Sequence, residues 1–504
     1  MGIYMSENQL KVENIRGFES LWSMNKPIVI PDFQRAYAWT EKNLMKLIED
    51  FRSFSQNRQK HDLADVYFMG AILLFDNGET FEVIDGQQRL TTLVILNYVL
   101  NKDNFPEKCK FSFTSPISIE LINKAKIFFA NEINESEKNI LRELLTKLEF
   151  TVTVTENQDD AFIFFDTQNS RGVKLKATEL LKAHHLREIN GISGQNEAAK
   201  RWESLELLRM NYGTEAQSNS ELKVIDQLFD HYLYHSRVWV GKVGKRVEFL
   251  DDFIEYEQRD ALMQEFGSKT IKCPDNSVRL YPHGSNQHVH SIEIDMRAQN
   301  GQGEYLPEYR YRAFKHTPLS IPFSLRQPVD KGMGYFLFVE KYAQLLQYLT
   351  NVSDNYLKEF DAFNSAIMFH PHNSKYARRF YMLCILSYFD KFGENGLIKF
   401  ALYLEFLIGA VRLENDRLAK NSLTNVYLRD ADVNLLDMIF NAYTPEQLFE
   451  WMMPLIKKQS IKYQNKGKGV QKSYLDNMRR YYGKGDNDDA SSKLTWLNEK
   501  VKSL

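Results

Sequence analysis

The residues best suited to bind a phosphate form one short turn, Asp85-Gly-Gln-Gln-Arg89. Phe81, Val83 and Ile84 before it are aromatic or β-branched, which is typical of a strand. Apolar residues from Leu90 onward recur with a period near 3.6, which predicts a helix with an apolar inner face. The first N–H groups of a helix attract anions, and an arginine adds a fork-shaped cationic donor. The turn is therefore a candidate phosphate or nucleotide site. The alternative is a capped turn in which Arg89 forms a structural ion pair.

Two predicted strands deliver this turn. Residues 66–75 form a continuous apolar run, which predicts a fully buried strand. Asp76-Asn-Gly78 is a hairpin signal that leads into the strand ending at Asp85. We therefore expect two adjacent antiparallel strands to position the candidate site.

A polar and aromatic segment at residues 27–40 is the second candidate part of the site. Val29 and Ile30 lie between two prolines, which favours a short edge strand. The loop after it carries closely spaced Asp32, Gln34 and Arg35 with two aromatic residues, Tyr37 and Trp39. Such side chains either stack on a base or pack as an ordinary loop. Thr40 is a good N-cap for an amphipathic helix over 41–54, and a polar loop is expected from Gln56 to Asp65.

A third candidate part follows two predicted helices within 117–148 and a predicted strand over 150–155. Residues 159–172 read as a helix that ends at Gln168–Gly172. This end is either a plain helix C-cap or one wall of the site. Thr178 is expected to cap the next helix, over 179–187.

From about residue 200 the pattern is mostly helical, with one β-containing or irregular insertion over 269–326. The predicted strands of the insertion are 277–281, 288–294 and 309–314. The predicted helices are 202–213, 221–236, 246–266, 334–350, 355–367, 376–392, 395–413, 446–458 and a short closing helix.

Length and composition narrow the class of protein. The chain has 504 residues, 43% of them hydrophobic and 13% aromatic, which is enough for two or three domains with large cores. A net charge of −2 means that any nucleic-acid contact must come from a local patch. Three distant cysteines argue against a disulfide framework or a zinc site, and no cluster of histidines suggests another metal site. With no signal peptide pattern and no long apolar run, we expect a cytoplasmic protein that does not span a membrane.

One local basic patch is present at residues 457–484. This stretch holds nine Lys or Arg, one acid and four interleaved tyrosines. It is either a solvated helix face or a nucleic-acid contact. The candidate nucleic-acid residues are Lys462, Lys466, Lys468, Lys472, Arg479 and Arg480.

Four motifs in order resemble the N-terminal domain of GmrSD-type restriction endonucleases, a ParB/sulfiredoxin-like family. They are Ile30-Pro-Asp-Phe-Gln-Arg-Ala-Tyr-Ala-Trp39, Tyr67-Phe-Met-Gly70, Val83-Ile-Asp-Gly-Gln-Gln-Arg-Leu-Thr-Thr92 and Phe165-Asp-Thr-Gln-Asn-Ser-Arg-Gly172. The likeness covers about residues 10–190. It implies an α+β protein in which a small mixed α/β domain over 1–190 handles a nucleotide. We expect a helical connector over 191–268, the insertion over 269–326 and a helical C-terminal domain over 327–504.

The resemblance also implies a nucleotide site and its chemistry. The implied nucleotide-binding residues are Gln34, Arg35, Gly86, Gln87, Gln88, Thr91, Asn169 and Arg171. Arg89, with Arg35, would neutralise the phosphates of an NTP, and Asp85 or Asp32 would hold Mg²⁺ or orient water during hydrolysis.

Relatives of this family regulate nucleases that attack modified phage DNA, and many carry a C-terminal HNH nuclease domain. Neither the HNH pattern nor a PD…(D/E)xK pattern is found in this sequence, so we expect a separate nuclease subunit. Sulfiredoxin-like reduction is disfavoured because no cysteine lies near the turn. We expect an NTP-hydrolysing regulator that contacts DNA and could form a homo-oligomer. A ParB-like adaptor that binds nucleotide without hydrolysis is the alternative, and a self-contained nuclease is the third hypothesis.

Overall fold

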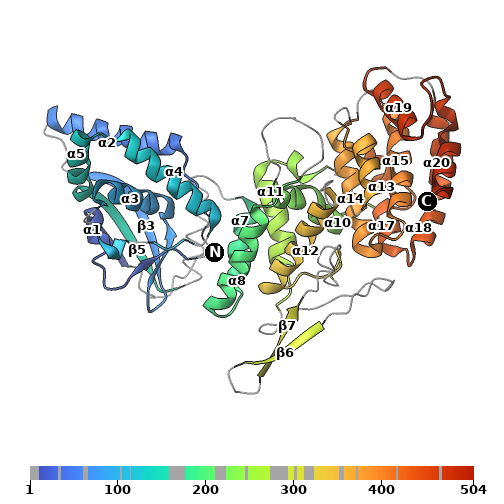
Figure 1. The fold of residues 1–504 in the computed structure, drawn as a ribbon. Coiled ribbons are helices and arrows are strands. Elements are labelled where there is room, and N and C mark those ends of the chain that lie inside the picture. Colours follow the sequence, from blue (N-terminus) through green and yellow to red (C-terminus); the bar gives the residue numbers. More distant parts are fainter. Residues whose placement is uncertain are drawn as a thin grey trace, which may run out of the picture. The chain divides into compact units, whose positions relative to one another are not determined.

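The structure is a computed structural model of the 504-residue chain (Figure 1). It describes residues 11–31, 34, 36–60, 66–102, 105–109, 111–113, 115–157, 176–210, 223–243, 248–272, 293–299, 304–310, 323–350, 357–370, 373–415, 418–464 and 468–504. The chain divides into two compact units. The N-terminal unit is Met1–Leu186 with Gln195–Lys200, and the C-terminal unit is Arg187–Gly194 with Arg201–Leu504.

A mixed five-stranded sheet forms the centre of the N-terminal unit, with strand order β1-β5-β3-β4-β2. Its strands are β1 (Lys11–Arg16), β2 (Ile28–Val29), β3 (Tyr67–Asp76), β4 (Phe81–Asp85) and β5 (Leu148–Thr155). Pairing is antiparallel for β1 with β5 and for β3 with β4, and parallel for β3 with β5 and for β2 with β4. The predicted β3–β4 hairpin and the edge position of β2 are thus confirmed.

The prediction of a fully buried strand over 66–75 is wrong. Within β3 only Ile72, Leu73 and Leu74 are buried. The physical reason is the unequal length of the hairpin strands, because β4 pairs only with Leu73–Asp76. Residues 67–72 of β3 pair with β5 on one edge and have no strand from the described residues on the other.

Helices pack on this sheet and close the core. They are α1 (Phe18–Leu21), α2 (Glu41–Lys60), α3 (Gln87–Leu100), α4 (Pro116–Glu132) and α5 (Glu135–Thr146), with a 3₁₀ turn at Glu107–Cys109. Helix α7 (Ala177–Arg187) follows later in the chain. Leu90, Leu93 and Leu96 of α3 are buried in one cluster with Ile72 and Val83 of the hairpin. The strand predicted before the turn and the helix predicted after it are therefore confirmed, and the apolar spacing of α3 is explained by this contact.

Two boundary predictions in this unit are wrong. Helix α2 runs on to Lys60, so the loop predicted from Gln56 begins later. Thr178 lies inside α7, and the Glu179 side chain caps the helix instead by accepting from the Lys176 N–H at 2.8 Å. The helix predicted over 159–172 lies outside the described residues.

The C-terminal unit is mainly helical (Figure 1). Its helices are α8 (Ile192–Glu206), α9 (Val224–Gln227), α10 (Tyr234–Val238), α11 (Glu255–Met263), α12 (Met333–Thr350), α13 (Lys358–Phe363), α14 (Lys375–Phe392), α15 (Leu397–Glu414), α16 (Ser422–Thr424), α17 (Leu435–Asn441), α18 (Pro445–Gln459), α19 (Val470–Tyr481) and α20 (Lys493–Lys502). Short π- or 3₁₀-helical turns follow or precede several of them, at Leu228–Leu233, Leu250–Asp252, Gln264–Ser268, Asn364–Met368, Asn425–Arg429, Ser460–Lys462 and Ala490–Ser492.

Helices α14 and α15 are apolar on nearly every side and form the core of this unit. The predictions for α12, α14, α15 and α18 are confirmed within two residues. The helix predicted at 202–213 is wrong in position, because α8 begins earlier and ends at Glu206. Helix α19 falls in the stretch that we had treated only as basic.

The insertion contains an antiparallel hairpin of β6 (Glu293–Gln299) and β7 (Glu304–Arg310). The prediction that this insertion contains β structure is confirmed, but the strands overlap the predicted ones only at 293–294 and 309–310. The predicted strand 277–281 and most of 288–294 and 309–314 lie outside the described residues. No helix in the described part of the chain has the length and apolar character needed to cross a membrane.

Candidate functional site

The candidate turn is a strand–glycine–helix junction. Strand β4 ends at Asp85, Gly86 has φ 100° and ψ 0°, and α3 begins at Gln87. A Cβ atom on Gly86 would lie 3.3 Å from Cγ1 of Ile72, so both the backbone angle and the close packing favour glycine. The first bond of the helix joins the Leu90 N–H to the Gly86 carbonyl at 2.9 Å.

The start of α3 has the character of an anion site. No side chain caps it, and its first turn contains no acidic residue. The backbone N–H groups of a first helical turn have no carbonyl partner within the helix, and the helix dipole is positive at this end. The junction is therefore chemically suited to a phosphate group.

Arg89 occupies the open edge of β3. Its Nη1 donates to the Met69 carbonyl at 3.2 Å, and its Nη2 donates to the Ala71 carbonyl at 2.7 Å. These two carbonyls belong to the part of β3 that β4 does not reach, so the guanidinium replaces the missing strand. Gly70 lies between them, and a Cβ atom there would come within 2.0 Å of Nη1. This close approach explains the glycine.

Asp85 and Arg89 are brought together as predicted, but they are loosely paired. Nη2 of Arg89 lies 3.4 Å from Oδ2 of Asp85, and the two side chains are 27% and 34% exposed. Three of the five guanidinium N–H groups thus have acceptors, which leaves Nε and one hydrogen of Nη1 without an acceptor among the described residues. Likewise, no donor to Oδ1 of Asp85 is found among the described residues.

Gln34 and Gln88 bind the protein itself. Nε2 of Gln34 donates to the carbonyls of Val83 and Ile84 at 2.9 and 2.8 Å. The Gln88 amide accepts from the Ala38 N–H at 2.8 Å and donates to the Ala36 carbonyl at 3.2 Å. Both amides thus fasten the segment around residue 36 to the strand and helix that form the turn, which is a positioning role.

Tyr37 completes this attachment, and sequence reasoning did not assign it that role. Its ring is fully buried and its hydroxyl lies 2.8 Å from Oγ1 of Thr92, while its N–H donates to Oγ of Ser118 at 3.0 Å. Burial raises the pKa of Tyr37 to about 12, and the Thr92 hydrogen bond opposes the shift only in part. Tyr37 and Thr92 each lie in one of the motifs named above, and this position in the sequence could have indicated their role.

The remaining predicted residues fall into two groups. Gln87 and Thr91 are buried, 5% and 1% exposed, so their side chains lie beneath the turn and not on its surface. The nucleotide-binding roles predicted for Gln87 and Thr91 stay predictions. Asp32, Arg35, Asn169 and Arg171 lie outside the described residues, and their roles stay predictions. Among the residues that the structure describes, no three His, Cys, Asp or Glu side chains form a metal cluster.

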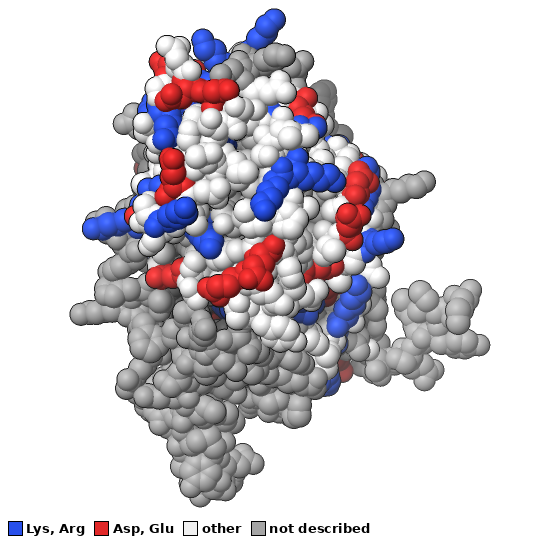
Figure 2. Space-filling view, turned by 90° about the vertical axis from the view of Figure 1, so that its right-hand side faces the viewer, with Lys and Arg blue, Asp and Glu red and all other residues white. Residues whose placement is uncertain are grey.

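The basic stretch at 457–484 contains both exposed cations and cations that are paired or buried. Lys462 pairs with Glu414, and Arg479 is buried, where its Nε donates to the Asp488 carbonyl at 3.0 Å. These two residues therefore have protein partners, whereas Lys468, Lys472 and Arg480 are exposed and Lys466 lies outside the described residues. Figure 2 shows acidic and basic side chains interspersed on the face that it presents.

The tyrosines of this stretch do not form a stacking surface. Tyr463 and Tyr474 surround the buried Lys493 ammonium, which lies 3.0 and 2.9 Å from their hydroxyls and 2.7 Å from both Glu405 oxygens. Burial lowers the pKa of Lys493 to about 8, although Glu405 favours its charged form. Gly409 makes room for both hydroxyls, because a Cβ atom there would lie 1.8 and 2.3 Å from them. The interleaving that suggested nucleic-acid contact thus reflects core packing.

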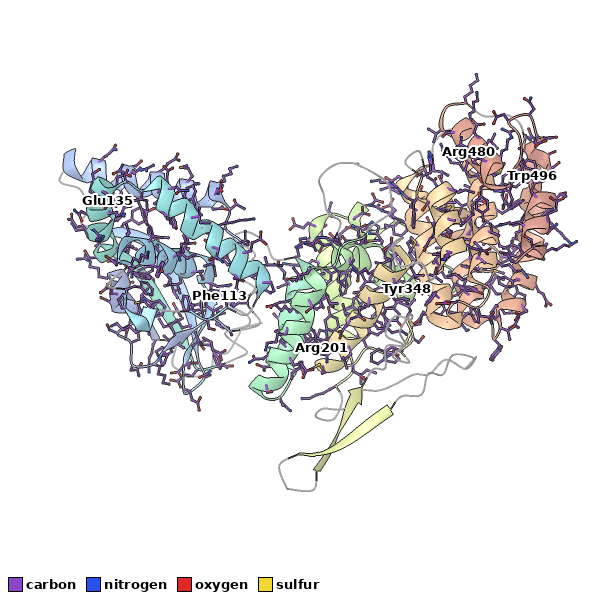
Figure 3. The ribbon with its side chains drawn as sticks, viewed as in Figure 1. Phe113, Glu135, Arg201, Tyr348, Arg480 and Trp496 are labelled. Carbon is purple, nitrogen blue, oxygen red and sulfur yellow. The ribbon has the colours of Figure 1, made fainter. Side chains whose placement is uncertain are left out.

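The same packing joins the last two helices. Tyr482, just after α19, and Trp496 of α20 have ring centroids 6.3 Å apart, and Lys484 pairs with Glu499 at 3.3 Å. Arg480 and Trp496 mark these two neighbouring helices in Figure 3. The exposed Lys and Arg residues of this region therefore lie on helices that are packed against each other.

Comparison with known proteins gives two family matches. Residues 18–186 match the model described as "GmrSD restriction endonuclease, N-terminal domain", which confirms the resemblance and connects the chain with restriction systems. Residues 194–468, more than half of the chain, match a family of unknown function, DUF7834. Neither model describes an HNH nuclease domain, and no curated protein matches the chain. The chain therefore belongs to the DUF7834 family and carries an N-terminal domain of the GmrSD restriction endonuclease type.

Proposed function

We propose that this chain binds an NTP at the start of α3, hydrolyses it, and serves as the regulatory component of a restriction system. The observation that carries the proposal is the uncapped helix start with Asp85 and Arg89 beside it. The output would be control of a nuclease subunit or of a DNA contact. The basic residues Lys468, Lys472 and Arg480 remain candidates for that contact because they are exposed.

The chemistry of the residues fits an NTP with Mg²⁺. The helix start supplies N–H donors for phosphate oxygens, and Arg89 supplies the N–H groups that Met69, Ala71 and Asp85 do not use. Mg²⁺ is usually held by one or two carboxylates together with substrate phosphates and water. Asp85 is a partly exposed carboxylate at the end of the strand and would either hold the ion or orient the attacking water.

Phosphate release with Mg²⁺ and each NTP tests this function. Asp85→Asn removes the charge and keeps the shape. Among the described residues the Asp85 side chain makes one long contact, of 3.4 Å to Arg89, so folding should be preserved. We expect turnover to fall at least about tenfold. Asp50→Asn, an exposed aspartate of α2, is the matched control and should leave turnover unchanged. Wild-type turnover by the Asp85 variant would remove Asp85 from the mechanism, and a wild-type chain without turnover would exclude hydrolysis.

A nucleotide-binding adaptor that does not hydrolyse NTP is the second candidate. The observation that favours it is the commitment of Arg89 to two backbone carbonyls, since an arginine that stabilises a transition state needs its fork directed at the phosphate. Equilibrium binding of NTP without phosphate release, with and without DNA, would support the adaptor.

A further inference from the structure

Phe68 is the most exposed aromatic side chain that the structure describes in the N-terminal unit, with 60% of its surface accessible. Its neighbour Tyr67 packs on Phe51 and Phe54 of α2, at ring-centroid distances of 5.2 and 5.3 Å. Successive side chains of a strand point to opposite faces. The Phe68 ring therefore points away from the α2 side of the sheet, into solvent.

Phe68 is followed along β3 by the residues that Arg89 binds. Met69, the next residue, accepts the hydrogen bond from Arg89, and Gly70 and Ala71 follow with little or no side chain. Along its own strand Phe68 is thus followed by small residues, while across the sheet it is paired with Glu149 of β5, whose carboxylate lies 3.7 Å from Nε of Arg16. Ala71 is itself exposed, so the strand is open to solvent at this position as well.

The spacing along β3 fits the length of a nucleotide. Leu73 is paired with Asp85, and Phe68 lies five positions before Leu73, which is about 16 Å of strand. The carbonyls bound by Arg89 lie between these two points. A nucleoside triphosphate in an extended conformation has a comparable length, so its phosphates can lie at the start of α3 while its base reaches Phe68.

We propose that Phe68 is the stacking platform for the base of the bound NTP. This inference rests on the proposed function. Stacking on a phenylalanine accepts any base, because every base has a π face. The site should therefore bind purine and pyrimidine triphosphates through the same contact, with Phe68 contributing to affinity and not to the choice of base.

Calorimetric binding to the full chain tests the inference, with the four NTPs and with inorganic tripolyphosphate, which has no base. Phe68→Leu keeps an apolar side chain of similar volume and removes the π face. We expect it to weaken binding of every NTP at least about fivefold and to leave tripolyphosphate binding unchanged. Phe68→Trp should bind NTP at least as tightly as the wild type. Ile127→Ala is the matched control, because Ile127 is 61% exposed on α4, and it should change neither affinity.

Each outcome decides between the hypotheses. If Phe68→Leu binds NTP like the wild type, or loses NTP and tripolyphosphate affinity equally, the stacking role is overturned while nucleotide binding stands. If the wild-type chain binds tripolyphosphate but no NTP more tightly, the base has no platform and the inference also fails. If the wild type binds neither, the proposed function itself is refuted.

Discussion

Replacing Gly70 by alanine should detach Arg89 from the edge of β3. The new Cβ atom would lie 2.0 Å from Nη1 and 3.2 Å from Cζ of Arg89, which is too close for both to stay. The guanidinium is the free end of a flexible side chain, so it would move and lose its bonds to the Met69 and Ala71 carbonyls. Gly70 also has φ 116°, which L-residues rarely adopt.

The magnitude follows from these two causes. The backbone strain costs about 1–2 kcal/mol. The two lost hydrogen bonds lie at a partly exposed edge and contribute about 1–2 kcal/mol together. We therefore expect Gly70→Ala to lower the free energy of unfolding of the N-terminal unit by about 3 kcal/mol.

Gly78 provides the matched control. It has φ 97°, but no atom lies within 4 Å of the position that its Cβ would take. Gly78→Ala should therefore lower the free energy of unfolding by the backbone strain alone. Arg89→Ala provides the second arm, because it removes the atom with which the Gly70 Cβ would collide. In that background Gly70→Ala should cost only the strain, about 1–2 kcal/mol.

Denaturant titration followed by hydrogen exchange of β3 peptides is the suitable assay. The chain has two compact units, so a single global transition would not report the N-terminal one alone. Equal costs for Gly70→Ala and Gly78→Ala would refute the proposed contact. So would a Gly70→Ala cost that is the same with and without Arg89.

Two further predictions concern ion pairs. Nζ of Lys26 donates to both Asp76 oxygens, at 2.5 and 2.7 Å, and lowers the pKa of the Asp76 carboxyl from its ordinary value of 3.8. The ion pair therefore stabilises the fold above pH 3.8, and this stabilisation is lost as the pH falls below that value. Unfolding free energy measured against pH should therefore fall less steeply below pH 4 in Asp76→Asn than in the wild type, and equal slopes would contradict this. In the C-terminal unit, Lys493→Met leaves the Glu405 charge buried without its cation and should cost about 3–5 kcal/mol by chemical denaturation. Adding Glu405→Leu should recover most of that loss, and a double variant no more stable than the single one would show that the pair is not the cause.

The hairpin and the turn could be predicted because their signals are local. Asp76-Asn-Gly78 and the strand-to-helix change at Gly86 depend only on neighbouring residues, and the structure confirms both. The same local reading identified Arg89 as a residue of interest. It could not show that β4 ends four residues before Arg89 while β3 extends past it, because strand length is set by pairing between segments.

The tyrosines of the basic stretch show what local sequence could not predict. Alternation of Tyr and Lys along 457–484 looks alike whether the rings face a nucleic acid or the core. Burial of Tyr463 and Tyr474 depends on Lys493 and Glu405, which are distant in the sequence, and on the absence of a side chain at Gly409. The sequence of residues 457–484 alone therefore cannot show whether these tyrosines are buried.

The two uses of Arg89 determine which variants can report on function. Its guanidinium closes the open edge of β3 and also borders the phosphate site, so Arg89→Ala would weaken both the sheet and nucleotide binding. Loss of turnover in that variant would not separate the two causes. Among the described residues, the side chain of Asp85 pairs with Arg89, at 3.4 Å, and Phe68 is 60% exposed, so variants of these two side chains should leave the Arg89 bonds to the β3 edge in place. Because Arg89 also has a structural role, the proposed site is best tested with variants of Asp85 and Phe68.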